Sequence, residues 1–67
     1  MIKVTRLDGT EYFLNPHQIE SLETTPDTVV TFVSGKKLII KESVDKVIRD
    51  IVKYRQRLRR WFDSNNE

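Results

Sequence analysis

The sequence predicts an α+β domain, a small five-stranded antiparallel β-meander followed by one long C-terminal amphipathic helix. The chain has 67 residues, of which 37% are hydrophobic and 33% charged, the balance of one small globular domain. Up to residue 41, turns that contain Gly or Pro separate short segments in which apolar and polar side chains alternate, a pattern typical of short strands. From Ser43 the apolar residues recur every three or four positions, the period of a helix. We therefore expect a single domain over residues 1–62, with the sheet at 2–41, the helix at 43–62 and a flexible polar tail at 63–67.

The first hairpin is predicted from two alternating, β-branched segments. Residues 2–7 and 10–14 form the expected strands, and Asp8-Gly9 lies between them. This dipeptide favours the positive φ angles of a two-residue type I′ turn.

A third strand is expected at residues 18–24, where the pattern is imperfect. Ile19 and Leu22 are three positions apart instead of two, so they would point to opposite faces of a regular strand. A bulge, or a short helical turn at Pro16-His17-Gln18, would reconcile this spacing. The segment Thr25-Pro26-Asp27 then forms a turn.

The second hairpin is predicted at residues 28–33 and 36–41, joined by Ser34-Gly35. Adjacent apolar residues such as Val29 and Val30, or Ile39 and Ile40, point to opposite faces of a strand. We therefore expect both faces of this hairpin to be covered, with Val30 and Ile40 in the core.

Ser43 is the expected N-cap of the C-terminal helix. The apolar residues of this helix follow a heptad pattern. Because the helix is longer than a five-stranded sheet is wide, its last turns should extend beyond the sheet. A chain this short also has a marginal core. Both features predict a homo-oligomer or another partner, with these interface residues: Ile51, Tyr54, Leu58, Trp61 and Phe62.

Basic side chains line the opposite side of the predicted helix: Lys46, Arg49, Lys53, Arg57 and Arg60. Residues 1–45 carry a net charge of −2 and residues 46–67 a net charge of +4. Three interpretations stay open for this basic face: a solvated surface, a contact with an acidic protein or with lipid headgroups, and a nucleic-acid site, which is the least favoured.

The sequence gives little indication of catalytic or metal-binding residues. The chain has no Cys and one His, His17, which we expect to be an exposed turn residue. Disulfides and Cys/His zinc sites are therefore excluded, and no catalytic serine or phosphate-loop motif is present. We expect no catalytic, metal or cofactor-binding residues and no enzymatic activity.

Several short segments, taken in order, resemble the small flagellar FlbD family, including its SwrD branch. They are Thr5-Arg6-Leu7-Asp8-Gly9, Leu14-Asn15-Pro16, Ile19-Glu20, Thr25-Pro26-Asp27-Thr28, Gly35-Lys36-Lys37 and Glu42-Ser43-Val44. The resemblance covers about residues 1–60, and no family pattern matches the segment from Arg59 to Asp63.

This resemblance implies a bacterial flagellar accessory protein that supports motility and swarming, and for the SwrD branch one that raises the power of the flagellar motor through its stator units. We therefore expect a cytoplasmic protein at the cytoplasmic face of the flagellar base, with a motor or stator protein as partner and peripheral contact with the inner membrane surface. The alternative is a small RNA- or DNA-binding regulator that uses the basic helix.

Overall fold

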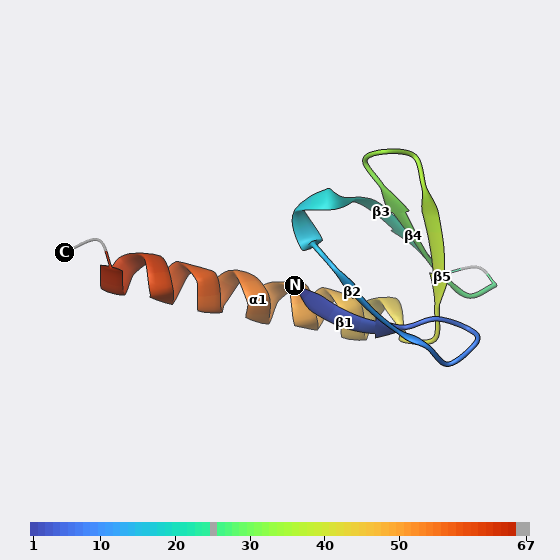
Figure 1. Ribbon diagram of the computed structural model, residues 1–67, viewed down its shortest axis with the longest axis horizontal. Coiled ribbons are helices and arrows are strands. Elements are labelled where there is room, and N and C mark those ends of the chain that lie inside the picture. The colour runs from blue at the N-terminus through green and yellow to red at the C-terminus, as the bar shows by residue number, and fades with distance from the viewer. Residues whose placement is uncertain (25, 66–67) are drawn as a thin grey trace.

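The computed structural model describes residues 1–24 and 26–65, and Figure 1 shows its elements in chain order. They are β1 (Ile2–Thr5), β2 (Glu11–Leu14), the 3₁₀ helix η1 (Pro16–Gln18), β3 (Ile19–Glu23), β4 (Thr28–Phe32), β5 (Lys37–Ile40) and α1 (Val44–Asn65). The predicted α+β class is confirmed, and each strand is one or two residues shorter than expected.

The strands form two antiparallel sheets instead of one continuous five-stranded meander. One sheet holds β1 and β2, and the other has the order β3-β4-β5. The division falls at Pro16, which has no N–H to donate to a neighbouring strand and begins η1 instead. An isolated β-bridge between Arg6 and Ile40 joins the two sheets, and the Lys41 N–H donates to the carbonyl oxygen of Thr5 at 2.8 Å.

Both hairpins close through three-residue loops ending in glycine, so the predicted type I′ turn at Asp8-Gly9 is wrong. The Gly9 N–H donates to the carbonyl oxygen of Arg6 at 2.9 Å, and the Arg6 N–H donates to that of Thr10 at 2.8 Å. Gly9 has φ +90°, and Gly35 has φ +89° at the equivalent place in the second hairpin. A type I′ turn needs positive φ at both central residues, and no described non-glycine residue, Asp8 included, has it.

The irregular spacing before β3 has both of the predicted causes. Asn15 caps η1, with its Oδ1 accepting the His17 N–H at 3.0 Å, and Pro16 occupies the first turn. The pairing of β3 with β4 then shifts between Ile19 and Ser21, which is the register change of a bulge. This shift brings Ile19 and Leu22 to the same face of the sheet, against the core.

The core lies where the two sheets meet the first half of α1. Its six buried apolar side chains come from four strands and the helix: Ile2, Val4, Leu14, Val30, Ile40 and Val47. Val30 and Ile40 are 0% and 1% exposed, as predicted for the second hairpin. The opposite face of this hairpin is not covered as expected, because Ile39 is 44% exposed and Val29 only half-buried.

Helix α1 begins at the predicted cap and runs three residues beyond the predicted end at residue 62. The Ser43 Oγ accepts the Lys46 N–H at 3.2 Å, and Asp45 lies in the first turn. Asp63 and Ser64, expected to start the polar tail, are helical, while residues 66–67 of that tail lie outside the described residues.

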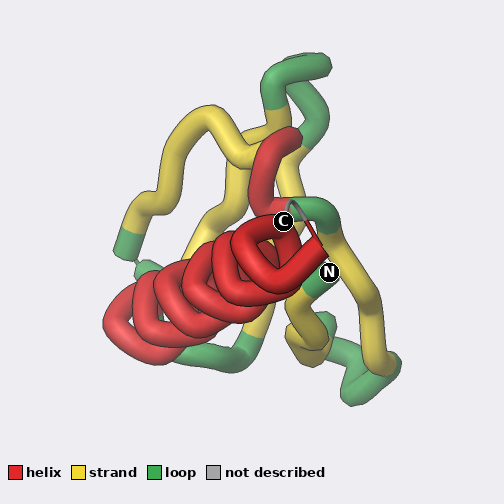
Figure 2. Tube along the Cα trace, turned by 90° about the vertical axis from the view of Figure 1, so that its left-hand side faces the viewer, coloured by secondary structure: helices red, strands yellow, loops and turns green. Residues whose placement is uncertain are grey.

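Only the first half of α1 packs against the sheets. The helix has 22 residues, about 33 Å at 1.5 Å per residue, and the molecule measures 46 × 22 × 19 Å. In Figure 1 the C-terminal half of α1 extends away from the strands, and Figure 2 shows the strands gathered above and to the right of the helix. The predicted overhang is therefore present.

Candidate partner-binding surface

The five predicted interface residues divide into two groups along α1. Ile51 and Tyr54 are half-buried and pack against the core, so the fold of the chain itself uses them. Leu58, Trp61 and Phe62 lie beyond the sheets and are 43%, 61% and 57% exposed.

The last packed turn of α1 is marked by an aromatic contact. The ring of His17, in η1, meets the ring of Tyr54 edge-on, with 6.1 Å between ring centroids and an angle of 70° between the planes. His17 is exposed, as predicted, but its ring also contacts α1 through Tyr54. From Arg55 to Ser64 every side chain is exposed, and we call these residues the projecting segment.

The projecting segment carries a shallow groove along one side of the helix. Its volume is about 290 Å³, and it is lined by Arg55, Leu58, Arg59, Phe62 and Asp63. The rings of Trp61 and Phe62 meet edge-on at 6.4 Å, and they form an aromatic pair beside the groove. A partner that covers this surface would remove three large apolar side chains from water.

The predicted basic face is exposed along its whole length, at Lys46, Arg49, Lys53, Arg57 and Arg60. The first of these, Lys46, is neutralised locally, because its Nζ lies 2.8 Å from Asp50 Oδ2 one turn further along the helix. Sequence reasoning missed this pair, although its i, i+4 spacing was readable as a helical ion pair. The other four residues of this face take part in neither of the two ion pairs in the described part of the chain.

Sequence reasoning also missed the polar links of the β1–β2 hairpin. The guanidinium of Arg6 lies 4.6 Å from the centroid of the Tyr12 ring, a cation–π contact within this hairpin. The carboxylate of Glu42 accepts hydrogen bonds from Thr5, on β1. No local sequence signal marks the second link, because the two residues are 37 positions apart.

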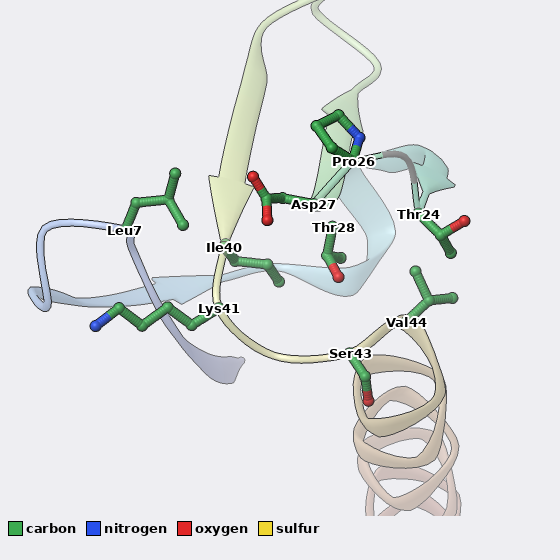
Figure 3. A pocket seen from close by; sticks show the side chains of 9 residues that line it. All are labelled: Leu7, Thr24, Pro26, Asp27, Thr28, Ile40, Lys41, Ser43 and Val44. Carbon is green, nitrogen blue, oxygen red and sulfur yellow. The ribbon is translucent and has the colours of Figure 1, made fainter.

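A separate open cavity lies near the start of α1, between the β3–β4 turn and the segment that leads from β5 into the helix. It has a volume of about 430 Å³ and is lined by Leu7, Thr24, Pro26, Asp27, Thr28, Ile40, Lys41, Ser43 and Val44. Figure 3 shows the side chain of Lys41 extending outward, away from Asp27 and Ser43. The Ser43 hydroxyl of this lining accepts the Lys46 N–H and caps α1.

Two further findings concern metals and membranes. Among the described residues, no three His, Asp or Glu side chains come together in a way that could hold a metal ion. No helix in the described part of the chain has the length and apolar character to cross a membrane. The candidate site of this chain is the projecting segment, because its large apolar side chains are exposed beside a groove.

Comparisons with known proteins gave one match. The FlbD family model, described as flagellar and swarming motility proteins, matches residues 1–59. This range includes both sheets and α1 up to Arg59, and it ends before Trp61 and Phe62. Neither the curated proteins nor the solved structures gave a significant match.

Proposed function

The chain belongs to the FlbD family of flagellar and swarming motility proteins, and from that membership we propose that it acts on the flagellar motor, at its stator units, through protein–protein contacts. The observation that carries the proposal is the family match over both sheets and most of α1. The exposed apolar side chains of the projecting segment supply a surface suited to binding rather than to catalysis. We propose a cytoplasmic location at the base of the flagellum and no enzymatic activity.

A deletion strain tests this function. We expect cells without the protein to build filaments but to rotate them with lower torque, so that swimming slows most in viscous medium and swarming fails. Torque is measured on tethered cells and filaments are counted by fluorescent staining. Complementation with the parent chain should restore torque, and cells without filaments would assign the protein to assembly or gene expression instead.

A small nucleic-acid-binding regulator is the alternative function, and it rests on the exposed basic face of α1. Binding to single-stranded RNA that weakens by orders of magnitude between low and moderate salt would support it, because phosphate contacts release counterions. The acidic balance of residues 1–45 favours the protein contact over this alternative.

We also propose that the chain forms a homo-oligomer through the open face of the three-stranded sheet. Val29 and Ile39 lie side by side on this face, with Glu23 beside Val29 and Lys37 two residues before Ile39 on the same strand. A two-fold contact could set Glu23 of one copy near Lys37 of the other, so the surface is self-complementary in charge. Symmetric pairing along the projecting segment is disfavoured, because it would oppose arginine with arginine.

A further inference from the structure

The projecting segment exposes a compact apolar arc. Leu58, Trp61 and Phe62 are spaced three and four positions apart, which brings them to one side of the helix within an arc of about 100°. They continue the stripe by which Ile51 and Tyr54 pack against the core. A large aromatic pair left in water beyond the last packed turn indicates a surface that is covered in function.

The projecting segment is also rich in positive charge. It contains four basic side chains, Arg55, Arg57, Arg59 and Arg60, and one acidic side chain, Asp63. At 100° per residue, Arg55 and Arg59 flank the apolar arc on one side and Arg57 flanks it on the other. Neither of the two ion pairs in the described part of the chain involves any of these four arginines.

Helices that lie at a lipid surface typically carry apolar and aromatic side chains with cations on both sides of them. Trp, Phe and Leu side chains enter the boundary between headgroups and acyl chains, while Arg and Lys contact the phosphates. A second copy of this helix carries the same positive charges and would be repelled. A flat layer of phosphates can contact the cations on both flanks at once, so the charge distribution favours a bilayer over a narrow protein seam.

We propose that the projecting segment docks on the surface of an anionic lipid bilayer. Because the sheets pack on the same side of α1 as the apolar arc, only the last turns of the helix can reach the bilayer, and α1 meets it at an angle. Leu58, Trp61 and Phe62 enter the interface, and the flanking arginines bind lipid phosphates. The sheets stay above the headgroups, open to a partner.

Trp61 gives a direct readout, because it is the only tryptophan of the chain. The full chain is titrated with vesicles of phosphatidylcholine containing about 30% phosphatidylglycerol, and with vesicles of phosphatidylcholine alone. We expect sedimentation with the anionic vesicles only, a blue shift of the Trp61 emission, and quenching of that emission by lipids brominated on their acyl chains. Raising the salt from about 0.05 M to about 0.5 M should release the protein, since screening weakens the phosphate contacts.

Two pairs of variants separate the apolar and the charged contributions while keeping Trp61 as the probe. Arg55→Gln with Arg59→Gln should weaken vesicle binding by about thirtyfold, at about fivefold for each cation near the surface. The matched control is Lys36→Gln with Lys41→Gln, which removes the same charge from exposed positions next to the sheets and should leave binding unchanged. Leu58→Ala with Phe62→Ala should weaken binding by at least about tenfold. Its control, Leu7→Ala with Phe13→Ala, removes two exposed apolar side chains from the first hairpin and should leave binding unchanged.

Each contrary result overturns the proposal in a recognisable way. Equal binding to neutral and anionic vesicles would remove the role of the arginines. Sedimentation without a shift of the Trp61 emission would assign the contact to another part of the surface. Tighter binding to single-stranded RNA or to an acidic protein, with the same sensitivity to the arginine variants, would assign the segment to that partner. All variants should melt like the parent, because the substituted side chains are exposed.

Discussion

The carboxylate of Glu42 accepts two hydrogen bonds from Thr5, one from the backbone N–H at 2.7 Å and one from the hydroxyl at 2.9 Å. Thr5 ends β1, and Glu42 lies between β5 and α1. The pair therefore fastens the two-stranded sheet to the segment that leads from the three-stranded sheet into the helix. Beside it, the Lys41 N–H donates to the carbonyl oxygen of Thr5 at 2.8 Å, so both backbone groups of Thr5 are used at this junction.

We predict that Glu42→Ala lowers the free energy of unfolding by about 1–2 kcal/mol, since hydrogen bonds to a charged group that is partly exposed are weaker than buried ones. Urea denaturation of the parent and the variant measures this difference. The control is Glu20→Ala, which removes an exposed carboxylate elsewhere in the chain. Equal losses in the two variants would show that the Thr5–Glu42 contact contributes nothing specific.

The same contact makes stability depend on acid. Partial burial of Glu42 opposes its ionisation, but the two hydrogen bonds from Thr5 outweigh burial and hold the pKa of this carboxyl below its ordinary value of 4.5. Because the pKa is lower in the folded chain, the contribution is fully present above pH 4.5 and is lost as the pH falls through the folded pKa. We expect the melting temperature of the parent to fall over this range, and to fall less steeply in Glu42→Gln.

Asp8, in the exposed loop of the first hairpin, also makes stability depend on acid. Asp8 Oδ1 accepts the hydroxyl of Thr10 at 2.6 Å and its N–H at 2.9 Å, and these bonds lower the pKa of Asp8. Asp8→Asn should therefore remove a second part of the acid sensitivity. Melting curves of Asp8→Asn, Glu42→Gln and the double variant measure the two parts separately.

We predict that Val30→Asp and Ile40→Asp each unfold the domain. Both side chains are buried, and an unpaired carboxylate in the core costs more than a domain of this size can lose. Circular dichroism on heating should show no cooperative transition for either variant. Ile39→Asp is the matched control, because Ile39 is the chain neighbour of Ile40 on the open face and should tolerate the charge. A cooperative melt of Ile40→Asp would contradict the observed register.

The glycine at the end of the first loop should be sensitive to substitution for backbone reasons alone. A Cβ at Gly9 would meet no atom within 4 Å, but its φ of +90° disfavours any L side chain. We expect Gly9→Ala to cost about 1 kcal/mol, and Gly9→Asn to cost less, because asparagine tolerates left-handed conformations better. Chemical denaturation of both variants checks this order, and an equal cost for Ala and Asn would argue for a different loop conformation.

Self-association through the open sheet face predicts a mass that depends on concentration. We expect light scattering after size exclusion to show a species larger than the 8.0 kDa chain, and Ile39→Glu to reduce its mass. In the same assay, Trp61→Ala with Phe62→Ala shows whether the projecting segment contributes to self-association. A monomer with a melt independent of concentration up to about 100 μM would exclude the oligomer, because assembly stabilises only the folded chain.

Several residues that carry the FlbD resemblance have a structural role in this chain. Gly9 and Gly35 take the positive φ at the loop ends, Asn15 caps η1, Ser43 caps α1, and Glu42 binds Thr5. The family segments therefore specify the fold more than a chemical site. The apolar end of the projecting segment, at Trp61 and Phe62, lies outside the family match.

The sequence by itself determined the features that arise from neighbouring residues. The five strands, the cap at Ser43, the irregular start of β3 and the amphipathic character of α1 all follow from periodicity and turn chemistry within a few positions. Such local patterns also placed Val30 and Ile40 in the core and predicted that α1 would overhang the sheets.

Only the tertiary structure decided how the two sheets are joined and which apolar residues stay exposed. The Arg6–Ile40 bridge and the Thr5–Glu42 contact join residues more than 30 positions apart, and no local pattern encodes such pairing. The heptad stripe of α1 looks uniform in sequence, yet its first half is packed and its second half is exposed. That difference depends on where the sheets end along the helix axis, which is a property of the packed molecule.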